Sequence, residues 1–436
     1  MTTFASSPPA SSPPAPAPTA RQPPDAPDPR GPAVLVLGGG TRLPRALRGH
    51  GMYVVYGGTP DEFTSAHHEA CDEAWLLADG SEDNWVRRAV ALHQVVPFRR
   101  VVTVRERFLT AAARIGDALG LGGNPLDTVL TLKDKFLMRQ SFDGLVDGGA
   151  VQARLMHTPG DVDAFVARVG LPVVLKPRDG SGSEDIAVVR DTDGIRAARQ
   201  RVRARPEALL AEEFLSGPEF SIETFTHGGR HKLLAVTEKF TGDNAVEIGH
   251  VIPARISADD RTALEETTCR FLDAVGLTEG PAHTEIILTA SGPRVVESHN
   301  RPGGDGIVDL VRHVHGVDIR DLLAAQTAGV ALPAASEPAG AAATWFLTAA
   351  PGIATEVSGW EAAAGRPGVV AVSPGTRAGD TVTPLRGSGD RCGSVTAVAE
   401  TPDEALDRAR GALALVTIRT DAALRDQQNP ESRESR

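Results

Sequence analysis

Between residues 33 and 120, short apolar runs alternate with stretches of helical spacing. The run AVLVL ends in three glycines, and similar runs, YVVY and VVTV, follow it. Strands that alternate with helices predict a parallel sheet covered on both faces. We expect strands within 33–40, 52–58, 72–78 and 99–106, and helices from Leu43 to Leu47, from Trp85 to Val95 and from Phe108 to Leu119.

The pattern changes after Asp127, where several strands follow one another with few helices between them. Consecutive strands with few helices between them are typical of an α+β domain rather than of a parallel sheet. We expect a helix in 128–142, a strand–turn–strand segment at 171–189, two strands around a tight SGPE turn in 208–226, a strand at 231–240, a helix at 259–275, paired strands at 284–288 and 294–296, and helices at 308–316 and 319–328.

Composition marks the ends of the chain and a linker. The first 32 residues hold eleven of the 32 prolines, which predicts a disordered tail with polyproline II character and not a signal peptide. The Ala/Pro-rich segment 332–340 reads as a linker to a separate small α+β unit. We expect a tail at 1–32, a parallel α/β domain at 33–127, an α+β domain at 128–331, a C-terminal α+β domain at 341–420 and a polar tail at 427–436.

Charge and cysteine content narrow the class of protein. The formal net charge of −11 argues against a nucleic-acid partner held by a basic surface. No apolar run approaches the roughly 18 residues that a membrane span requires. Cys71, Cys269 and Cys392 share no metal-ligand or redox spacing and fit buried thiols. We therefore expect a cytoplasmic protein with neither a nucleic-acid nor a membrane partner.

The glycine turn Gly38–Gly40 follows the first strand, as the glycines of a dinucleotide-binding motif do. The third glycine of that fingerprint is missing, because Leu43 stands in its place. The turn therefore fits a structural tight turn that could face a substrate.

Two acids and an arginine gather after the later strands. Glu285 is expected at the end of one apolar strand and Glu297 at the end of the next, with Arg301 four residues on. Paired carboxylates can share hard divalent cations, and an arginine nearby can stabilise a phosphoryl group or an oxyanion. An ordinary surface salt-bridge patch is the alternative.

Lys176 ends the apolar run VVLK and precedes the turn 179–183, DGSGS. A lysine beside a Gly/Ser turn suits a polyphosphate, because the ammonium supplies charge and the bare backbone amides supply donors. A hairpin with a solvated lysine is the alternative. Glu212, Glu213 and Glu219 flank an apolar dipeptide and a tight turn, which suits a nucleotide base and ribose; a surface hairpin with acidic ends is the alternative.

The ordered series of these motifs resembles the ATP-grasp superfamily of carboxylate–amine ligases. The series is KDKFLMR with Lys135, VLKPRDGSGS with Lys176, EEFLSGPE, then Glu285, Glu297 and Arg301, and the resemblance covers residues 33 to 330. The run RPGGDG and the C-terminal unit with GVVAVSPGTRAGDTV are more similar to bacterial L-amino acid ligases, the dipeptide synthetases. The resemblance implies an ATP-grasp fold with a parallel-sheet domain before it and a small α+β domain after it.

The resemblance also implies an ATP site. Lys135 and Lys176 would contact the phosphates, with Lys176 also serving catalysis. A flap made of Ser181, Gly182 and Ser183 would cover the phosphates. Glu212 and the backbone of Glu213 and Leu215 would hold adenine, and Glu219 would hold the ribose.

By the same resemblance, Glu285 and Glu297 would bind Mg²⁺, for which Mn²⁺ could substitute, and Arg301 would stabilise the acyl phosphate. The family pattern Glu-x-Asn-x-Arg departs here, because His299 stands at the third position and Asn300 next to it. An imidazole is a poorer ligand for magnesium than an amide oxygen. Either His299 coordinates weakly, or a water or Asn300 takes its place.

Substrate contacts come last in the resemblance. Glu247 and His250 lie in a segment that closes over the acyl acceptor, where His250 could relay a proton; a histidine that merely caps a loop is the alternative. Glu106 would face a substrate amine, and Gly303, Gly304 and Asp305 would shape a second pocket, in which Asp305 would suit an ammonium group.

The sequence thus predicts an ATP-dependent ligase that joins a carboxylate to an amine, with an amino acid as one substrate. The family resemblance alone implies a homodimer. Two alternatives remain: an ATP-grasp carboxylase that uses bicarbonate, and a catalytically vestigial nucleotide-binding protein.

Overall fold

The structure is a computed structural model that describes residues 31–422, apart from 79, 143–149, 181, 183–184, 207 and 243–245. The predicted tails, up to residue 30 and from 427 onward, lie outside the described residues, and so do the flap serines Ser181 and Ser183. Among the helices that the structure describes, none is both long and apolar enough to span a membrane.

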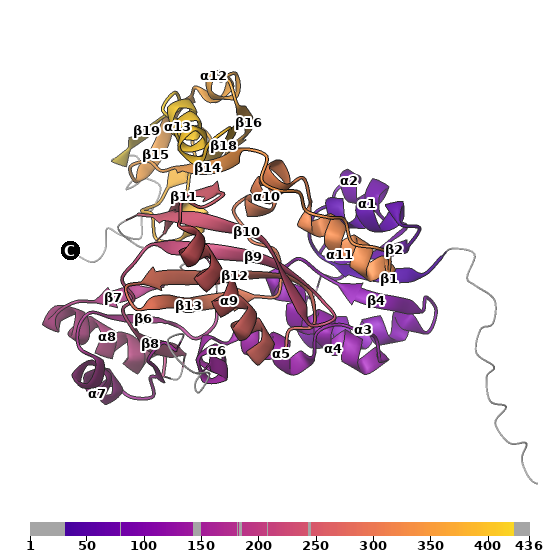
Figure 1. The fold of residues 1–436 in the computed structure, drawn as a ribbon, viewed down its shortest axis with the longest axis horizontal. Coiled ribbons are helices and arrows are strands. Elements are labelled where there is room, and N and C mark those ends of the chain that lie inside the picture. Colours follow the sequence, from indigo (N-terminus) through magenta and orange to yellow (C-terminus); the bar gives the residue numbers. More distant parts are fainter. Residues whose placement is uncertain are drawn as a thin grey trace, which may run out of the picture.

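The N-terminal domain holds a parallel four-stranded sheet of order β3-β2-β1-β4 (Figure 1, indigo). Its strands are β1 (Ala33–Leu37), β2 (Tyr53–Gly58), β3 (Glu73–Leu76) and β4 (Phe98–Val102). Its helices are α1 (Arg42–Gly49), α2 (Ser65–Ala70), α3 (Glu82–His93) and α4 (Leu109–Leu119), with the 3₁₀ turn η1 (Glu106–Phe108) before α4.

Strand β1 is buried on both faces, as its unbroken apolar run predicts. Val34 and Val36 pack in one core with Leu43 and Leu47 of α1, whereas Leu35 and its neighbours pack in another core with α3 and α4. The predicted parallel sheet is confirmed. The fourth strand is shorter than predicted, because the chain leaves the sheet after Val102 and Glu106 begins η1.

An antiparallel sheet of eight strands forms the centre, in the order β13-β12-β9-β10-β11-β14-β18-β16. Its strands are β9 (Glu219–His227), β10 (Arg230–Thr241), β11 (Glu247–Ile252), β12 (Glu279–Thr289), β13 (Gly292–His299), β14 (Ala341–Leu347), β16 (Val369–Pro374) and β18 (Gly393–Ala399). Helix α9 (Ala258–Ala274) covers the β9–β12–β13 part of this sheet, where Phe271 packs with Phe220 and Ile286.

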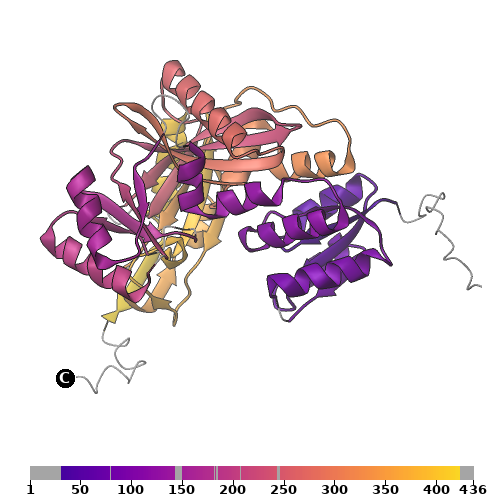
Figure 2. The same cartoon turned by 90° about the horizontal axis from the view of Figure 1, so that it is seen from below.

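Helices α10 (Ile307–His315) and α11 (Ile319–Ala328) join the central sheet to the N-terminal domain. Leu310 and Leu322 share a core with Val36 and Leu43 of the first domain. Helices α5 (Leu126–Lys133) and α6 (Lys135–Phe142) follow the N-terminal domain in the chain. Figure 2 shows these helices between the N-terminal domain and the rest of the molecule. This packing brings residues after β4 close to residues after β13.

A second four-stranded sheet, of order β5-β8-β6-β7, faces the central one. It contains β5 (Ala153–Leu155), β6 (Val173–Pro177), β7 (Ala187–Val189) and β8 (Leu209–Glu213), covered by α7 (Pro159–Val169) and α8 (Thr192–Ala204).

The two strands around the SGPE turn do not form a hairpin, which excludes the surface-hairpin alternative. Strand β8 lies in the small sheet and β9 in the central sheet, so the turn carries the chain from one sheet to the other. Gly217 has φ +156° there, and a Cβ on it would lie 2.1 Å from the carbonyl oxygen of Leu288. Only glycine, which has no side chain, fits this close approach. The turn thereby places the small sheet and the central sheet on opposite sides of one space.

The C-terminal region is the small α+β unit that the sequence predicted, but three of its strands extend the central sheet. Strands β14, β18 and β16 continue the central sheet, since Gly249 of β11 pairs with Trp345 of β14. A smaller sheet of β17 (Thr381–Val382), β15 (Gly352–Ser358) and β19 (Thr417–Asp421) completes the region, with α12 (Trp360–Ala364), α13 (Pro402–Leu413) and the turn η2 (Ser388–Asp390). Residues 332–340 hold no helix or strand. The proposed domain boundaries remain predictions.

Candidate active site

A cavity of about 920 Å³ opens between the small sheet and the central sheet. Its lining combines apolar side chains from both sheets with acidic and basic ones. The residues predicted to contact ATP that the structure describes all lie here, apart from Gly182, which lines a neighbouring cavity. The lining residues are Lys135, Val174, Lys176, Pro177, Asp179, Gly180, Ile186, Val188, Glu212, Glu213, Phe214, Leu215, Glu219, Glu285, Ile287, Val296 and Glu297.

Lys176 is buried against Glu212 rather than solvated. Its Nζ lies 2.7 Å from Oε2 of Glu212, and Nε of Arg139 donates to Oε1 of the same carboxylate at 2.8 Å. Burial lowers the pKa of Lys176, whereas Arg139 and Lys176 overcome the effect of burial and lower the pKa of Glu212. Glu212 thus holds two cations in place, and Arg139 is a member of this group that the sequence analysis missed.

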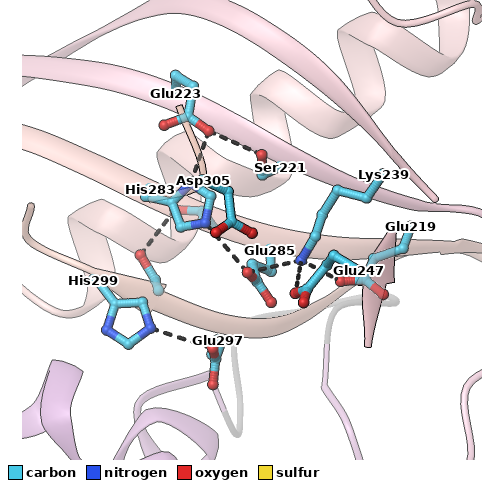
Figure 3. A network of polar contacts seen from close by, with 12 residues as sticks. Glu219, Ser221, Glu223, Lys239, Glu247, His283, Glu285, Glu297, His299 and Asp305 are labelled. Atoms are coloured by element: carbon cyan, nitrogen blue, oxygen red, sulfur yellow. Dashed lines mark hydrogen bonds and ion pairs between the residues drawn. The ribbon is translucent and has the colours of Figure 1, made fainter. Parts of the chain in front are cut away.

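Lys239 stands at the centre of three carboxylates (Figure 3). Its Nζ lies 2.6 Å from Glu219, 2.8 Å from Glu285 and 3.2 Å from Glu247. Burial would lower the pKa of Lys239, but the three glutamates raise it well above its usual value. The carboxylates lie close enough together to share a cation. Sequence analysis missed Lys239, whose one local signal is its position opposite Glu219 in the β9–β10 ladder.

Glu285 and Glu297 lie directly opposite one another in the β12–β13 ladder. Both stand inside longer strands than predicted, not at strand ends, and both are part of the cavity lining. Burial would raise the pKa of Glu285, but Lys239 leads the opposing effects and lowers it to about 2. The pKa of Glu297 lies well below its usual value, since His299 and Lys135 outweigh burial. The surface salt-bridge alternative is wrong, because these groups are buried in a cavity wall.

This pair fits a magnesium site. Two ionised carboxylates on adjacent strands offer the hard oxygen ligands that Mg²⁺ takes. Lys135 lies 3.0 Å from Glu297 and Lys239 lies 2.8 Å from Glu285, so each carboxylate is charge-balanced within the protein.

The buried side chain of His283 contacts the carboxylate of Glu285 (Figure 3). Nε2 of His283 lies 3.2 Å from Glu285, and its Nδ1 lies 2.7 Å from Glu223, which also accepts a hydrogen bond from Ser221. Burial would lower the pKa of His283, but Glu223 and Glu285 raise it to about 9. The protonated ring therefore orients Glu285. None of these three supporting residues was predicted from the sequence.

His299 bridges two acids. Its Nε2 lies 3.3 Å from Glu297 and its Nδ1 lies 3.1 Å from Glu106. Burial would lower the pKa of His299, but the two glutamates raise it, which favours an imidazolium over a metal-ligating imidazole. Asn300 lines a different cavity, together with Arg100 and other residues, which argues against the alternative in which Asn300 replaces His299 as a ligand.

Arg301 joins the two halves of the molecule. Its Nε donates to Glu106 of η1 at 2.5 Å, and its Nη1 donates to the carbonyl of Pro302 at 2.9 Å. Burial would raise the pKa of Glu106, but His299 and Arg301 lower it to about 2. Glu106 is therefore an anion whose charge is matched by protein groups.

A second cavity, of about 590 Å³, adjoins the first at Glu285 and Glu297. The predicted substrate residues Glu247, His250, Gly304 and Asp305 line it, whereas Glu106 and Gly303 line a third cavity next to it. The other lining residues are Gly182, Lys239, His283, His299, Arg301, Ile307 and Ser388. His250 lies in strand β11, so it does not cap a loop.

Asp305 already has a cationic partner. Arg391, from the C-terminal region, donates to both of its carboxylate oxygens, and His250 lies 3.3 Å away. Burial would raise the pKa of Asp305, but His250 and Arg391 lower it. This pairing argues against the expectation that Asp305 is a free anion awaiting a substrate ammonium, and sequence analysis did not identify Arg391.

Comparison with known proteins agrees with this arrangement. Residues 169–309 match the ATP-grasp domain family, and residues 345–421 match the L-amino acid ligase C-terminal domain 2 family. The alanine–anticapsin ligase of Bacillus subtilis strain 168 is 24% identical over 267 residues, 56% of this chain and 56% of that protein. The chain spans 56 to 59% of the length of the first curated ligases that it matches.

Two solved structures share the fold. An L-amino acid ligase from Bacillus licheniformis superposes with a TM-score of 0.76 and 22% identity, over 90% of this chain and 99% of that one. A phosphoribosylglycinamide synthetase from Anaerococcus prevotii gives 0.69 and 18%, over 89% and 100%. The predicted fold is thus confirmed: the chain is an ATP-grasp protein with an L-amino acid ligase C-terminal domain.

Proposed function

We propose that the protein is an ATP-dependent carboxylate–amine ligase that forms an amide bond through an acyl phosphate, with an amino acid as one substrate. The observation that carries this proposal is the meeting of two cavities at Glu285 and Glu297. The first cavity has apolar walls and buried lysines, as a nucleotide requires, and the second is polar and contains Arg301. The C-terminal match to an L-amino acid ligase domain supports an amino acid as a substrate.

ATP would bind in the first cavity. Its base would lie among the apolar side chains of the lining, which include Val174 and Ile287. Lys135 and Lys176 supply positive charge for the phosphates, and both are already fixed by acidic partners. Glu285 and Glu297 would hold Mg²⁺, which neutralises phosphate charge during phosphoryl transfer.

The acid would bind in the second cavity. One of its carboxylate oxygens attacks the γ-phosphorus, and the bond to the ADP oxygen breaks. Arg301 lies at the cavity wall, where its guanidinium can balance the negative charge of the acyl phosphate. Because the reaction needs little covalent help from the protein, positioning and charge neutralisation account for most of the rate.

The amine then attacks the acyl carbon, loses a proton and expels phosphate. His250 is the candidate proton acceptor, because it lines the second cavity and its Nδ1 has no hydrogen-bond partner among the described residues. Contact between Nε2 and Asp305 fixes the ring in one orientation.

The test is a phosphate-release screen with Mg²⁺ and ATP over pairs of amino acids and small carboxylates, with bicarbonate included. We expect release that requires both an acid and an amine, and a product whose mass is their sum less one water. Release that needs bicarbonate and no amine would identify a carboxylase instead. No release over a wide panel would overturn the ligase proposal.

A further inference from the structure

We propose that a third cavity, at the carboxyl edge of the N-terminal sheet, binds a second anionic group of the acid substrate, either a carboxylate or a phosphate. The inference rests on the ligase function proposed above and narrows it to acids with two anionic groups. The cavity has an open volume of about 1400 Å³. It is lined by Gly39, Gly40, Thr41, Arg42, Leu43, Val104, Arg105, Glu106, Arg107, Arg301, Pro302, Gly303, Gly304, Val308 and Arg320.

Arginine dominates this lining. Five guanidinium groups reach it from four parts of the chain, and Glu106 is the one acid among the described lining residues. Guanidinium groups bind carboxylates and phosphates through paired, charge-assisted hydrogen bonds. The lining therefore matches an anion in both charge and geometry, although the chain as a whole carries a net charge of −11.

The arginines of this lining form ion pairs with carboxylates around the cavity. Glu62 lies against both Arg105 and Arg107. Asp309 and Asp318 are shared between Arg42 and Arg320, at 2.8 to 3.1 Å.

Glu106 pairs with Arg301. Asp61 also interacts with Arg107, and Asp321 with Arg42 and Arg320. Arg105 has the weakest partner, at 3.9 Å, and its side chain is 53% exposed, so it can turn toward a ligand at little cost.

The backbone adds donors at the same place. Strand β1 lies between β2 and β4, and β1 and β4 are parallel. The chain adds β2 and β3 on one side of β1 and then returns to place β4 on the other side, so the strand order reverses between β1 and β4. Crevices at such points of a parallel sheet bind ligands. Gly39 has φ +88°, and a Cβ there would lie 3.1 Å from Val104 across the crevice. Helix α1 starts here without a side-chain cap, which leaves the backbone N–H groups of Arg42 and Leu43 available to an anion; Pro44, the next residue, has no N–H.

The third cavity communicates with the second. Arg301 and Gly304 line both of them. A carboxylate that reacts beside Arg301 can therefore belong to a molecule whose other end lies among Arg42, Arg105 and Arg107. A Cβ added to Gly304 would meet no other atom within 4 Å, so the space beside this shared residue is open.

The test compares matched ligands that differ in one negative charge. The full-length protein is titrated by calorimetry with L-glutamate and L-glutamine, and separately with O-phospho-L-serine and L-serine. We expect at least one anionic ligand to bind roughly tenfold or more tightly than its neutral partner, as charge-assisted hydrogen bonds allow. The pair that shows the larger ratio distinguishes a carboxylate from a phosphate.

The variant that tests the residues is R105Q/R107Q, since both side chains are about half exposed and their loss should not prevent folding. Its preference for the anionic ligand should fall to roughly unity. Arg45 is the matched control, because it lies on α1 at 56% exposure but does not line the cavity; R45Q should keep the preference.

Equal binding of charged and neutral ligands, no binding of any of the four, or an unchanged preference in R105Q/R107Q would overturn the subsite. Anion-selective binding that R105Q/R107Q removes, in a protein that releases no phosphate from ATP with any acid and amine, would support the subsite and overturn the ligase proposal. The two proposals can thus fail separately.

Discussion

Arg391 holds the carboxylate of Asp305 with both of its terminal nitrogens, at 2.8 Å and 2.5 Å. The guanidinium also stacks on Phe346, 3.7 Å from the ring centroid. Asp305 adopts φ +53°, a left-handed conformation that is uncommon outside glycine. This pair connects the C-terminal region to the wall of the second cavity, which Asp305 lines, so the C-terminal region helps to hold that wall in place.

Replacing Arg391 with Ala should lower the free energy of unfolding by about 1–3 kcal/mol, because a mostly buried carboxylate loses its partner. Arg419→Ala is the matched control: its side chain is 73% exposed, and its loss should change stability by less than about 0.5 kcal/mol. Urea denaturation measures both. Equal, small effects would show that the Arg391 pair contributes nothing to stability.

Stability that depends on Asp305 should weaken in acid. Its pKa is lower in the folded protein than the ordinary value of 3.8, so its contribution is complete above that value and is lost as the pH falls toward the lowered pKa. The difference in unfolding free energy between the native sequence and Asp305→Asn should therefore be larger near about pH 6 than near about pH 3. A difference that grows on acidification would contradict the pairing.

Lys176→Met should weaken ATP binding by roughly ten- to a hundredfold, because the first cavity loses a buried cation aimed at the phosphates. Lys232→Met is the control, since Lys232 is exposed on β10 and does not line the cavity. Titration with ATP and Mg²⁺ gives both dissociation constants. An unchanged constant for Lys176→Met would remove the phosphate-binding role of Lys176.

Arg301→Ala should leave ATP affinity nearly intact and reduce turnover by about a hundredfold or more, the usual cost of losing a group that stabilises developing charge. Phosphate release and ATP titration, measured on the same preparation, separate the two effects. Arg301 also holds Glu106, so Arg301→Lys is a second variant that keeps a charge there. Full turnover in Arg301→Ala would rule out its assigned role.

His299→Ala should raise the Mg²⁺ concentration needed for half-maximal rate by roughly tenfold, as loss of a group that orients a metal ligand commonly does. The reason is that His299 steadies Glu297 and connects it to Glu106. His68→Ala, at an exposed position on α2, is the control and should show no change. The same Mg²⁺ requirement in both variants would mean that His299 does not support the metal site.

The sequence by itself predicted the parallel sheet and the order of the motifs, but not helices α2, α7 and α8. Apolar runs that alternate with helical segments predicted the parallel sheet, because a strand buried on both faces must be continuously apolar, as β1 is. Local motifs also gave residues that line the first cavity, since Lys176, Glu212 and Glu285 each stand on an apolar strand that forms its wall. Such signals are local, and strand and helix formation depend on neighbours in the chain.

Only the tertiary structure decided which charges meet. Lys239 contacts Glu285, and Arg391 contacts Asp305, across separations that no spacing rule relates. The pairing of β11 with β14 could not be predicted from the sequence either, because the fold decides which strand edges lie next to each other. Buried charges must find partners wherever folding places them, so the partners of a catalytic residue are properties of the packed molecule and not of its local sequence.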